Sequence, residues 1–251
     1  MRAPRRAARV SGLLAIAREG QMDSATFRSR RFLILLSTLA VVLAVQSLSQ
    51  GLAASSIITD VLVILAVLAV FFLIFEQTSQ RLAALVAAIA AIAITGAHHL
   101  LPDKFHVPLA VAYHGLLIVF LGWALVEILR SLFAEKPVQT DDIFGAVCGY
   151  IIAGSAWANL YALSELLVPG SFSVDPTIQG ELADWHGRRA LFAYFSFTAI
   201  SSLGYADVTP TRAPATTMVL MEVVFGQFYL AVVVAQIVSM RLTQAVKSLG
   251  K

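Results

Sequence analysis

Charged residues are scarce in this chain. Asp, Glu, Lys and Arg together make up 13% of its 251 residues, whereas they make up about a quarter of a typical soluble protein. Hydrophobic residues account for 59% of the chain, and its mean hydropathy is +0.81. This composition excludes a disordered chain and is typical of an integral membrane protein, so we expect a lipid bilayer around it.

Cysteine occurs once, as Cys148, so neither an intrachain disulfide nor a metal site built from several cysteines is possible. Paired catalytic carboxylates, a nucleophile elbow and a phosphate-binding glycine loop are also missing from the sequence. We therefore predict no enzyme activity, no bound metal and no cofactor. Because Cys148 lies in an apolar segment, we interpret it as a small packing residue.

The chain contains several long hydrophobic runs. Six apolar segments reach or approach the roughly 20 residues that a helix needs to cross about 30 Å of hydrocarbon. They cover residues 32–49, 57–75, 82–97, 108–129, 143–167 and 214–240. We predict an all-α membrane protein with six transmembrane helices, in which a basic tail (1–31) precedes a four-helix membrane domain (32–130).

Positive charge is concentrated near the N-terminus, where residues 1–31 hold eight arginines and only two acidic residues. With both termini in the cytoplasm, fourteen Lys and Arg residues lie on the inner side of the membrane and four on the outer side. This asymmetry predicts a multi-pass protein of the cell (inner or plasma) membrane with cytoplasmic termini. A basic tail beside a hydrophobic span indicates the cytoplasmic side rather than a nucleic-acid partner.

The segment between the last two apolar runs reads Ser-Leu-Gly-Tyr-Ala-Asp at 202–207. It resembles the selectivity filter of potassium channels, Thr-Val-Gly-Tyr-Gly-Asp, and the six-span layout resembles bacterial six-transmembrane members of the potassium channel superfamily. In that family four copies of the loop replace the hydration shell of an ion with carbonyl oxygens. The resemblance implies a pore domain at 141–245, with a re-entrant pore helix and filter loop between helices five and six. The implied filter and ion-binding residues are Ser202, Leu203, Gly204, Tyr205 and Ala206.

Four further residues are implied to support the filter. Tyr194 and Thr198 lie in the segment that resembles the pore helix, and Asp207 closes the filter segment. The family commonly pairs this aspartate with an acid at the place of Thr198, so we expect Tyr194 to donate a hydrogen bond to Asp207 instead. Glu222 is an ionisable group within the last span, where such groups are costly and usually functional. We expect it to support the filter through Thr198 or Ser201; attraction of ions, or a protonated and simply hydrogen-bonded carboxyl group, are the alternatives.

Two other positions bear on the pore. Gly226 follows Gly204 by 22 residues, near the place where family members often have a hinge glycine, and it can serve as a hinge or permit close helix packing. Ala206 stands where the family has a second filter glycine. Its Cβ disfavours the left-handed backbone that glycine adopts easily, which implies either strain or a loosened outer ion site with weaker potassium selectivity.

The four-helix domain lacks the features of a voltage sensor. Segment 108–129 contains no arginine, and Arg130 just beyond it can pair with Glu127. The histidines of this domain are His98, His99, His106 and His114. Histidines can sense pH or bind a metal, but we interpret these as a chance cluster near the outer ends of the spans.

Passive ion conduction is the function that the resemblance implies. The expected protein is a homotetrameric potassium channel, or a weakly selective channel for monovalent cations, with K⁺ as the permeant ion and one quarter of the filter on each chain. One alternative is a channel-like membrane scaffold that does not conduct, which Ala206 favours. Another is a membrane metal or redox protein that uses the histidines.

Overall fold

The computed structural model describes residues 30–48, 55–75, 78–134, 139–182 and 185–249. The basic tail predicted at 1–31 lies outside these residues apart from its last two positions. The described chain is mostly helical, as the composition predicts. Its long helices are α2 (Arg31–Leu48), α3 (Ser55–Ile74), α4 (Thr78–Leu100), α5 (His106–Phe133), α6 (Thr140–Leu167) and α8 (Ala213–Leu249), with a short 3₁₀ helix η1 (Asp103–Phe105) before α5.

Each long helix coincides with one predicted span. Four of them contain a stretch long and apolar enough to cross a membrane, namely Gln80–His98, Asp103–Phe133, Thr140–Leu167 and Ala213–Ser239. The apolar stretches found in the described parts of α2 and α3 are shorter, Arg31–Val45 and Asp60–Ile74. The structure thus gives a mostly helical protein with four candidate membrane spans, where the sequence predicted six.

The helix ends follow local sequence rules. Pro108 and Pro214 fall in the first turns of α5 and α8, where the missing backbone N–H removes no helical hydrogen bond. α6 begins with a capping box, in which the Gln139 side chain bonds the backbone of Asp142 and the Asp142 side chain bonds the backbone of Gln139. Near the end of α5, Arg130 lies 2.9 Å from Oε1 of Glu127, which confirms the ion pair expected from the sequence.

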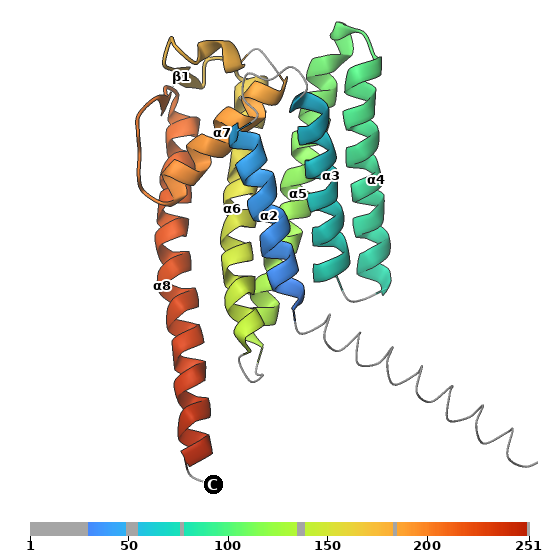
Figure 1. Cartoon of the computed structure of the whole chain (residues 1–251). Helices are drawn as coiled ribbons and strands as arrows, with labels where there is room; N and C mark the ends of the chain where they lie inside the picture. Colours follow the sequence, from blue (N-terminus) through green and yellow to red (C-terminus); the bar gives the residue numbers. More distant parts are fainter. Residues whose placement is uncertain (1–29, 49–54, 76–77, 135–138, 183–184, 250–251) are drawn as a thin grey trace, which may run out of the picture.

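The main core lies between α2, α3, α5 and α6 (Figure 1). α5 and α6 share the most extensive contact, α2 lies against both α3 and α6, and α4 packs against α3 and α5. Leu35, Phe75 and Tyr113 are among the fully or almost fully buried side chains of this core. α8 joins it through Tyr229, whose hydroxyl donates a hydrogen bond of 2.7 Å to the Ala146 carbonyl.

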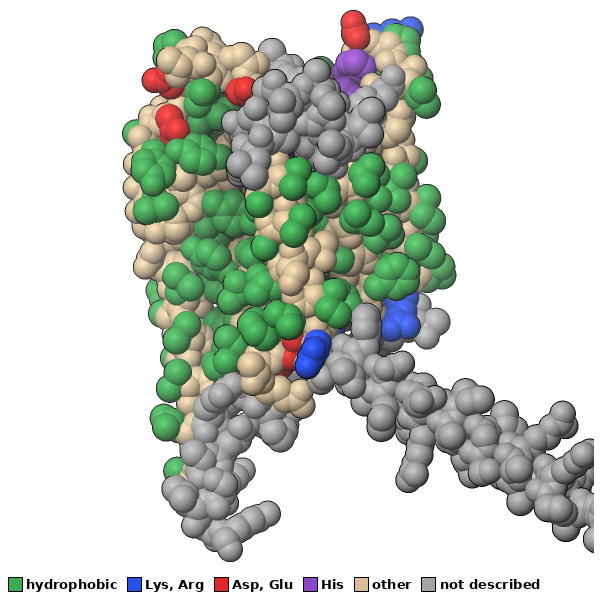
Figure 2. All heavy atoms as spheres, viewed as in Figure 1, with side chains coloured by type: hydrophobic (Ala, Val, Ile, Leu, Met, Phe, Trp, Pro, Cys, Tyr) green, Lys and Arg blue, Asp and Glu red, His purple; other side chains and the backbone are tan. Residues whose placement is uncertain are grey.

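Hydrophobic side chains form a broad band over the middle of the molecule, and most of the coloured charged side chains lie near its two ends (Figure 2). Large apolar residues on this surface are well exposed; Phe72, Val119 and Phe228 are 65%, 71% and 66% exposed. A continuous apolar surface of this kind is unfavourable in water. It is compatible with a protein whose helices are surrounded by hydrocarbon.

The chain between α6 and α8 leaves one end of the molecule and comes back to it (Figure 1). It forms β1 (Phe172–Val174), a short 3₁₀ helix η2 (Gln179–Leu182) and then α7 (Trp185–Ile200), which runs obliquely across α6 and α8. Residues 201–207 then return to β2 (Val208–Pro210), which pairs antiparallel with β1. The start of α2 and the end of α8 both lie at the end of the molecule opposite β1 and β2.

Candidate functional site

The predicted filter residues form a stretch of irregular backbone between α7 and β2. Ser202, Gly204 and Ala206 have φ angles of 60°, 60° and 67°, so every second residue of 202–206 lies in the left-handed region. Residues with a Cβ disfavour this region, and regular helices and strands do not contain such an alternation. Ala206 therefore has the left-handed backbone conformation that is unfavourable for a residue with a Cβ.

The carbonyl oxygens of residues 202–206 carry the polar character of this stretch. Within the described residues, no hydrogen bond ends on any of these five oxygens. Most backbone carbonyls of folded proteins find a partner in the protein or in water. Unpaired carbonyl oxygens arranged in series are also the groups that can replace the hydration shell of a monovalent cation.

The N–H groups at the start of the same stretch bind back to α7. The N–H groups of Leu203 and Gly204 both donate to the carbonyl oxygen of Thr198, at 2.8 and 3.3 Å. The neighbouring helix α8 contributes Gln227, whose Nε2 donates to Oγ of Ser202 at 2.9 Å. The N–H groups of Leu203 and Gly204 are thus used within the chain, whereas the five carbonyl oxygens of the loop accept no hydrogen bond among the described residues.

Asp207 fixes the far end of the loop. Its side chain lies beside Tyr194, the residue expected from the sequence to be its donor. The Tyr194 ring also lies parallel to that of Tyr205, with 6.3 Å between centroids and 7° between planes. The carbonyl oxygen of Asp207 accepts a 2.9 Å bond from the Asp175 N–H, which extends the β1–β2 pairing to the loop. A role in supporting a filter remains a prediction for Tyr194 and Asp207.

A second carboxylate lies beside this end of the loop. Asp175 accepts hydrogen bonds from the hydroxyl and the N–H of Thr177, at 2.6 and 2.9 Å. These two bonds hold the pKa of Asp175 below its usual value, so the group is negatively charged at neutral pH. Together with Asp207, it favours cations near this end of the loop.

Glu222 is fully buried in α8 and links three helices. Its Oε1 lies 2.5 Å from the hydroxyl of Ser196 in α7, and its Oε2 accepts a hydrogen bond from the hydroxyl of Tyr161 in α6. The Ser196 hydroxyl also lies 2.7 Å from the Gly154 carbonyl oxygen. A buried carboxylate needs such donors because an unpaired one is very costly.

The partners expected for Glu222 were wrong. Thr198 and Ser201 instead bond the backbone within their own helix region, at 2.8 Å to the Phe195 carbonyl and 2.5 Å to the Phe197 carbonyl. Hydroxyl groups near a helix end often bond a carbonyl three or four residues earlier. Glu222 nevertheless contacts α7, the helix that leads into the loop.

Gly226 marks a close approach of α8 to the end of α7. A Cβ at this position would collide with the carbonyl oxygen of Ile200. That carbonyl also accepts a 3.0 Å hydrogen bond from the Tyr150 hydroxyl. α8 runs without interruption through Gly226, so the structure has the close packing that the sequence offered as one alternative, and the hinge stays a prediction.

The loop stands away from the body of its own chain. Leu203 and Tyr205 are 62% and 64% exposed although both are large and hydrophobic. Hollows of about 350 and 340 Å³ flank the loop, one toward α8 and one toward α2. Such a surface is expected where another protein chain packs.

In the part of the chain that the structure describes, no group of three or more His, Cys, Asp or Glu residues is placed to hold a metal ion. His98 stacks on His106 with ring centroids 4.3 Å apart. His114 is buried, with Nδ1 2.8 Å from Oδ1 of Asn159. The side chain of His99 lies outside the described atoms.

Comparisons of the chain with protein-family models, with curated proteins and with solved structures find no match. The site is therefore defined by its own geometry. Sequence reasoning missed four of its residues, whose hydroxyl or amide groups lie in otherwise apolar helices: Tyr150, Tyr161, Ser196 and Gln227. Polar groups at such positions are costly without a partner, which is the signal that points to them.

Proposed function

We propose that the chain is one subunit of a homotetrameric channel that conducts potassium, or monovalent cations with weak selectivity, without catalysing a reaction. The observation that carries the proposal is the loop at 202–206, in which positive φ angles alternate and the carbonyl oxygens accept no hydrogen bond within the described residues. Four such loops around one axis would offer rings of carbonyl oxygens to a dehydrated ion.

The incompleteness of one chain supports an assembly of four. A single loop supplies one side of an ion site, and the exposed Leu203 and Tyr205 have hollows on either side of them. α8 adds large exposed apolar residues at several turns, among them Leu220, Val224 and Phe228. Neighbouring subunits would cover part of this surface, and lipid the rest.

The proposed topology has six transmembrane helices, α2 to α6 and α8, with α7 and the loop re-entering the membrane from the outer side. Support comes from the arrangement of the helices, since α2 begins and α8 finishes at the end opposite β1 and β2. Both termini are then cytoplasmic in a cell membrane, and residues 32–130 form a scaffold beside the pore domain at 141–245. Glu222 would hold the pore helix through Ser196.

Ion flux in liposomes tests this function. The purified full-length chain is expected to release K⁺ from loaded liposomes down its gradient. Gly204→Val should abolish the flux, because a β-branched residue at φ 60° is strongly disfavoured. The matched control is Gly96→Val in α4, where an added Cβ meets nothing within 4 Å, and it should leave the flux unchanged.

Two results would contradict the proposal. Wild-type protein that is folded and tetrameric but releases no K⁺ would favour the alternative of a scaffold that does not conduct. Equal flux from wild type and Gly204→Val would mean that ions do not pass along residues 202–206.

A further inference from the structure

A buried carboxylate joins the four-helix region to α7. Asp60 lies in the second turn of α3 and is 5% exposed. Its Oδ1 lies 2.8 Å from Nη1 of Arg189, and its Oδ2 lies 3.2 Å from Nε2 of His186. Both partners belong to the first two turns of α7. One carboxylate on α3 therefore contacts two side chains near the start of α7.

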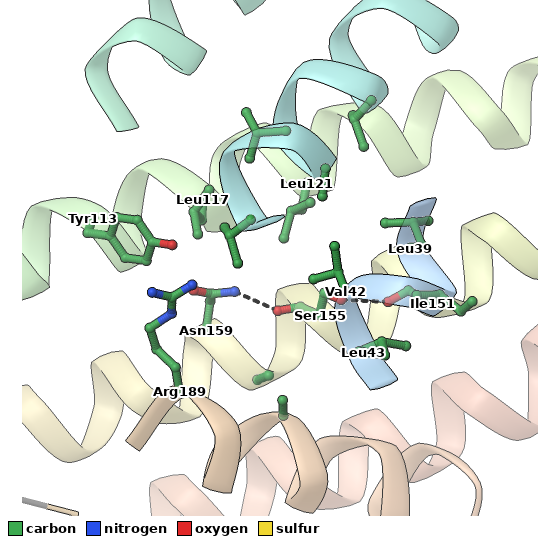
Figure 3. Close-up of a pocket in the computed structure, with 16 residues that line it drawn as sticks. Leu39, Val42, Leu43, Tyr113, Leu117, Leu121, Ile151, Ser155, Asn159 and Arg189 are labelled. Atoms are coloured by element: carbon green, nitrogen blue, oxygen red, sulfur yellow. Dashed lines mark hydrogen bonds between the residues drawn. The ribbon is translucent and has the colours of Figure 1, made fainter. Parts of the chain in front are cut away.

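The Arg189 side chain lies in apolar surroundings. It is 8% exposed, and Figure 3 shows it reaching from α7 toward Tyr113 of α5. The guanidinium carbon lies 5.3 Å from the centre of the Tyr113 ring. A cavity of about 100 Å³ beside Arg189 has a mostly aliphatic wall, to which α2, α3, α5, α6 and α7 contribute. Because an unpaired charge is very costly in such surroundings, Asp60 and Arg189 each depend on the other.

Stability alone does not explain a buried ion pair of this kind. The cost of removing two charges from water offsets much of their attraction, so an apolar pair of similar volume is often equally stable. In some proteins buried polar groups instead select one arrangement of the helices. The contacts of Asp60 would select one position of α7 relative to α3.

A second polar contact holds α7 further along its length. The Ser196 hydroxyl contacts Glu222 of α8. Arg189 precedes Ser196 by seven residues, which is about 10 Å of helix at about 1.5 Å per residue. A helix that is held at two separated points has a defined direction, whereas a helix held at one point can tilt about it. Asp60 thus provides one of two points that fix the direction of α7.

The direction of α7 is transmitted to the loop at 202–206 through the Thr198 carbonyl. This oxygen accepts hydrogen bonds from the N–H groups of Leu203 and Gly204, at 2.8 and 3.3 Å. The start of the loop is therefore attached to the end of α7. A change in the direction of α7 would displace the carbonyl oxygens of the loop with it.

We propose that Asp60 is a positioning residue for the loop, which it influences by holding α7 through Arg189 and His186. The four-helix region is then more than a scaffold, because its helix α3 sets the direction of the helix that leads into the loop. The effect on ion flux rests on the proposed function, whereas the effect on the structure of the loop does not.

The test replaces both charged groups by apolar side chains, in Asp60→Leu combined with Arg189→Met. Either change alone leaves one buried charge without its partner and should lower the melting temperature by about 5 °C or more. The double variant should melt within about 2 °C of the wild type, because neither charge remains. If the pair positions the loop, the double variant should still release K⁺ from liposomes at least about fivefold more slowly, a factor typical of coupling between sites.

Hydrogen–deuterium exchange reports on the loop without relying on conduction. The N–H groups of Leu203 and Gly204 should exchange at least about fivefold faster in the double variant than in the wild type, because their hydrogen bonds to α7 open more often. The matched control is Glu127→Leu combined with Arg130→Met, which removes a pair 2.9 Å apart near the end of α5. Its flux and its exchange rates should equal those of the wild type.

The exchange rates decide the inference. A folded double variant in which Leu203 and Gly204 exchange at the wild-type rate would overturn it, whatever the flux. If the double variant does not fold, Asp60→Asn is measured instead, since it keeps a side chain of the same shape and removes the charge. Exchange in Asp60→Asn should be faster than in the wild type, and an equal rate would overturn the inference.

Failure of the proposed function gives a different result. If wild-type protein releases no K⁺, ion conduction is wrong, and the exchange rates alone decide the role of Asp60. Faster exchange in the double variant with unchanged K⁺ flux would support the positioning role and would contradict the passage of ions along residues 202–206.

Discussion

Replacing Ala206 by glycine should raise the preference of the channel for K⁺ over Na⁺. Ala206 has φ 67°, where its Cβ is unfavourable and a glycine is not. If strain at this residue weakens the order of the outermost carbonyl groups, removing the Cβ restores the outer ion site. Selectivity for K⁺ depends on the number and the field strength of the coordinating carbonyl groups, so the preference for K⁺ should increase.

The size of the effect follows from two opposing terms. A left-handed conformation costs a residue with a Cβ about 1–2 kcal/mol. Glycine loses about 0.4–1 kcal/mol more backbone entropy when it is ordered. The net gain is on the order of 0.5–1 kcal/mol per subunit, or about 2–4 kcal/mol for four subunits. Such a difference changes the ratio of ordered to disordered filter states by tenfold or more.

The measurement is the reversal potential in planar bilayers under bi-ionic K⁺ and Na⁺ conditions, for wild type and Ala206→Gly. The control is Ala83→Gly at an exposed position in α4, which should cost about 1 kcal/mol of helix stability and leave the permeability ratio unchanged. A wild-type ratio that already strongly favours K⁺, and that Ala206→Gly does not change, would refute the strain argument.

Three further predictions concern the helices around the loop. Glu222→Ala should destabilise the protein by about 2–5 kcal/mol in thermal unfolding, because the buried Tyr161 hydroxyl loses its acceptor. Glu222→Gln should lower the stability less, and an equal loss of stability in both variants would contradict this. Gly226→Ala should lower the stability by about 1–3 kcal/mol and reduce the K⁺ flux, because a Cβ collides with the Ile200 carbonyl. Altered gating at unchanged stability would instead indicate a hinge. Conductance should depend weakly on voltage, since α5 has no arginine before its last turn; a steep voltage response in planar bilayers would contradict it.

The sequence was most informative about features that depend on local chemistry. Runs of apolar residues predicted the positions of all six long helices, because a long apolar segment can satisfy its backbone hydrogen bonds internally as a helix. The short motif at 202–207 predicted where regular structure stops. The left-handed backbone at Gly204 and Ala206 falls at the two positions where the sequence placed glycine-like angles, whereas the left-handed Ser202 was not expected.

Features that depend on how helices are rotated against one another could not be predicted. The partners of Glu222 are a clear case, since Ser196 and Tyr161 come from two other helices and only their packing brings them to one carboxylate. The cavity of about 100 Å³ that Arg189 helps to line is another, because five separate helices form its wall. The β1–β2 pairing and the contact of Gly226 with Ile200 likewise join residues far apart in the sequence.

The most direct test of the central claim is to locate a permeant ion between four copies of the loop. Crystals of the full-length protein grown or soaked in Tl⁺ or Rb⁺ would give anomalous difference density at ion sites. The account predicts a fourfold assembly with peaks on its axis, each ringed by carbonyl oxygens of residues 202–206. A fourfold axis without such peaks, or an assembly in which these loops lie apart, would contradict it.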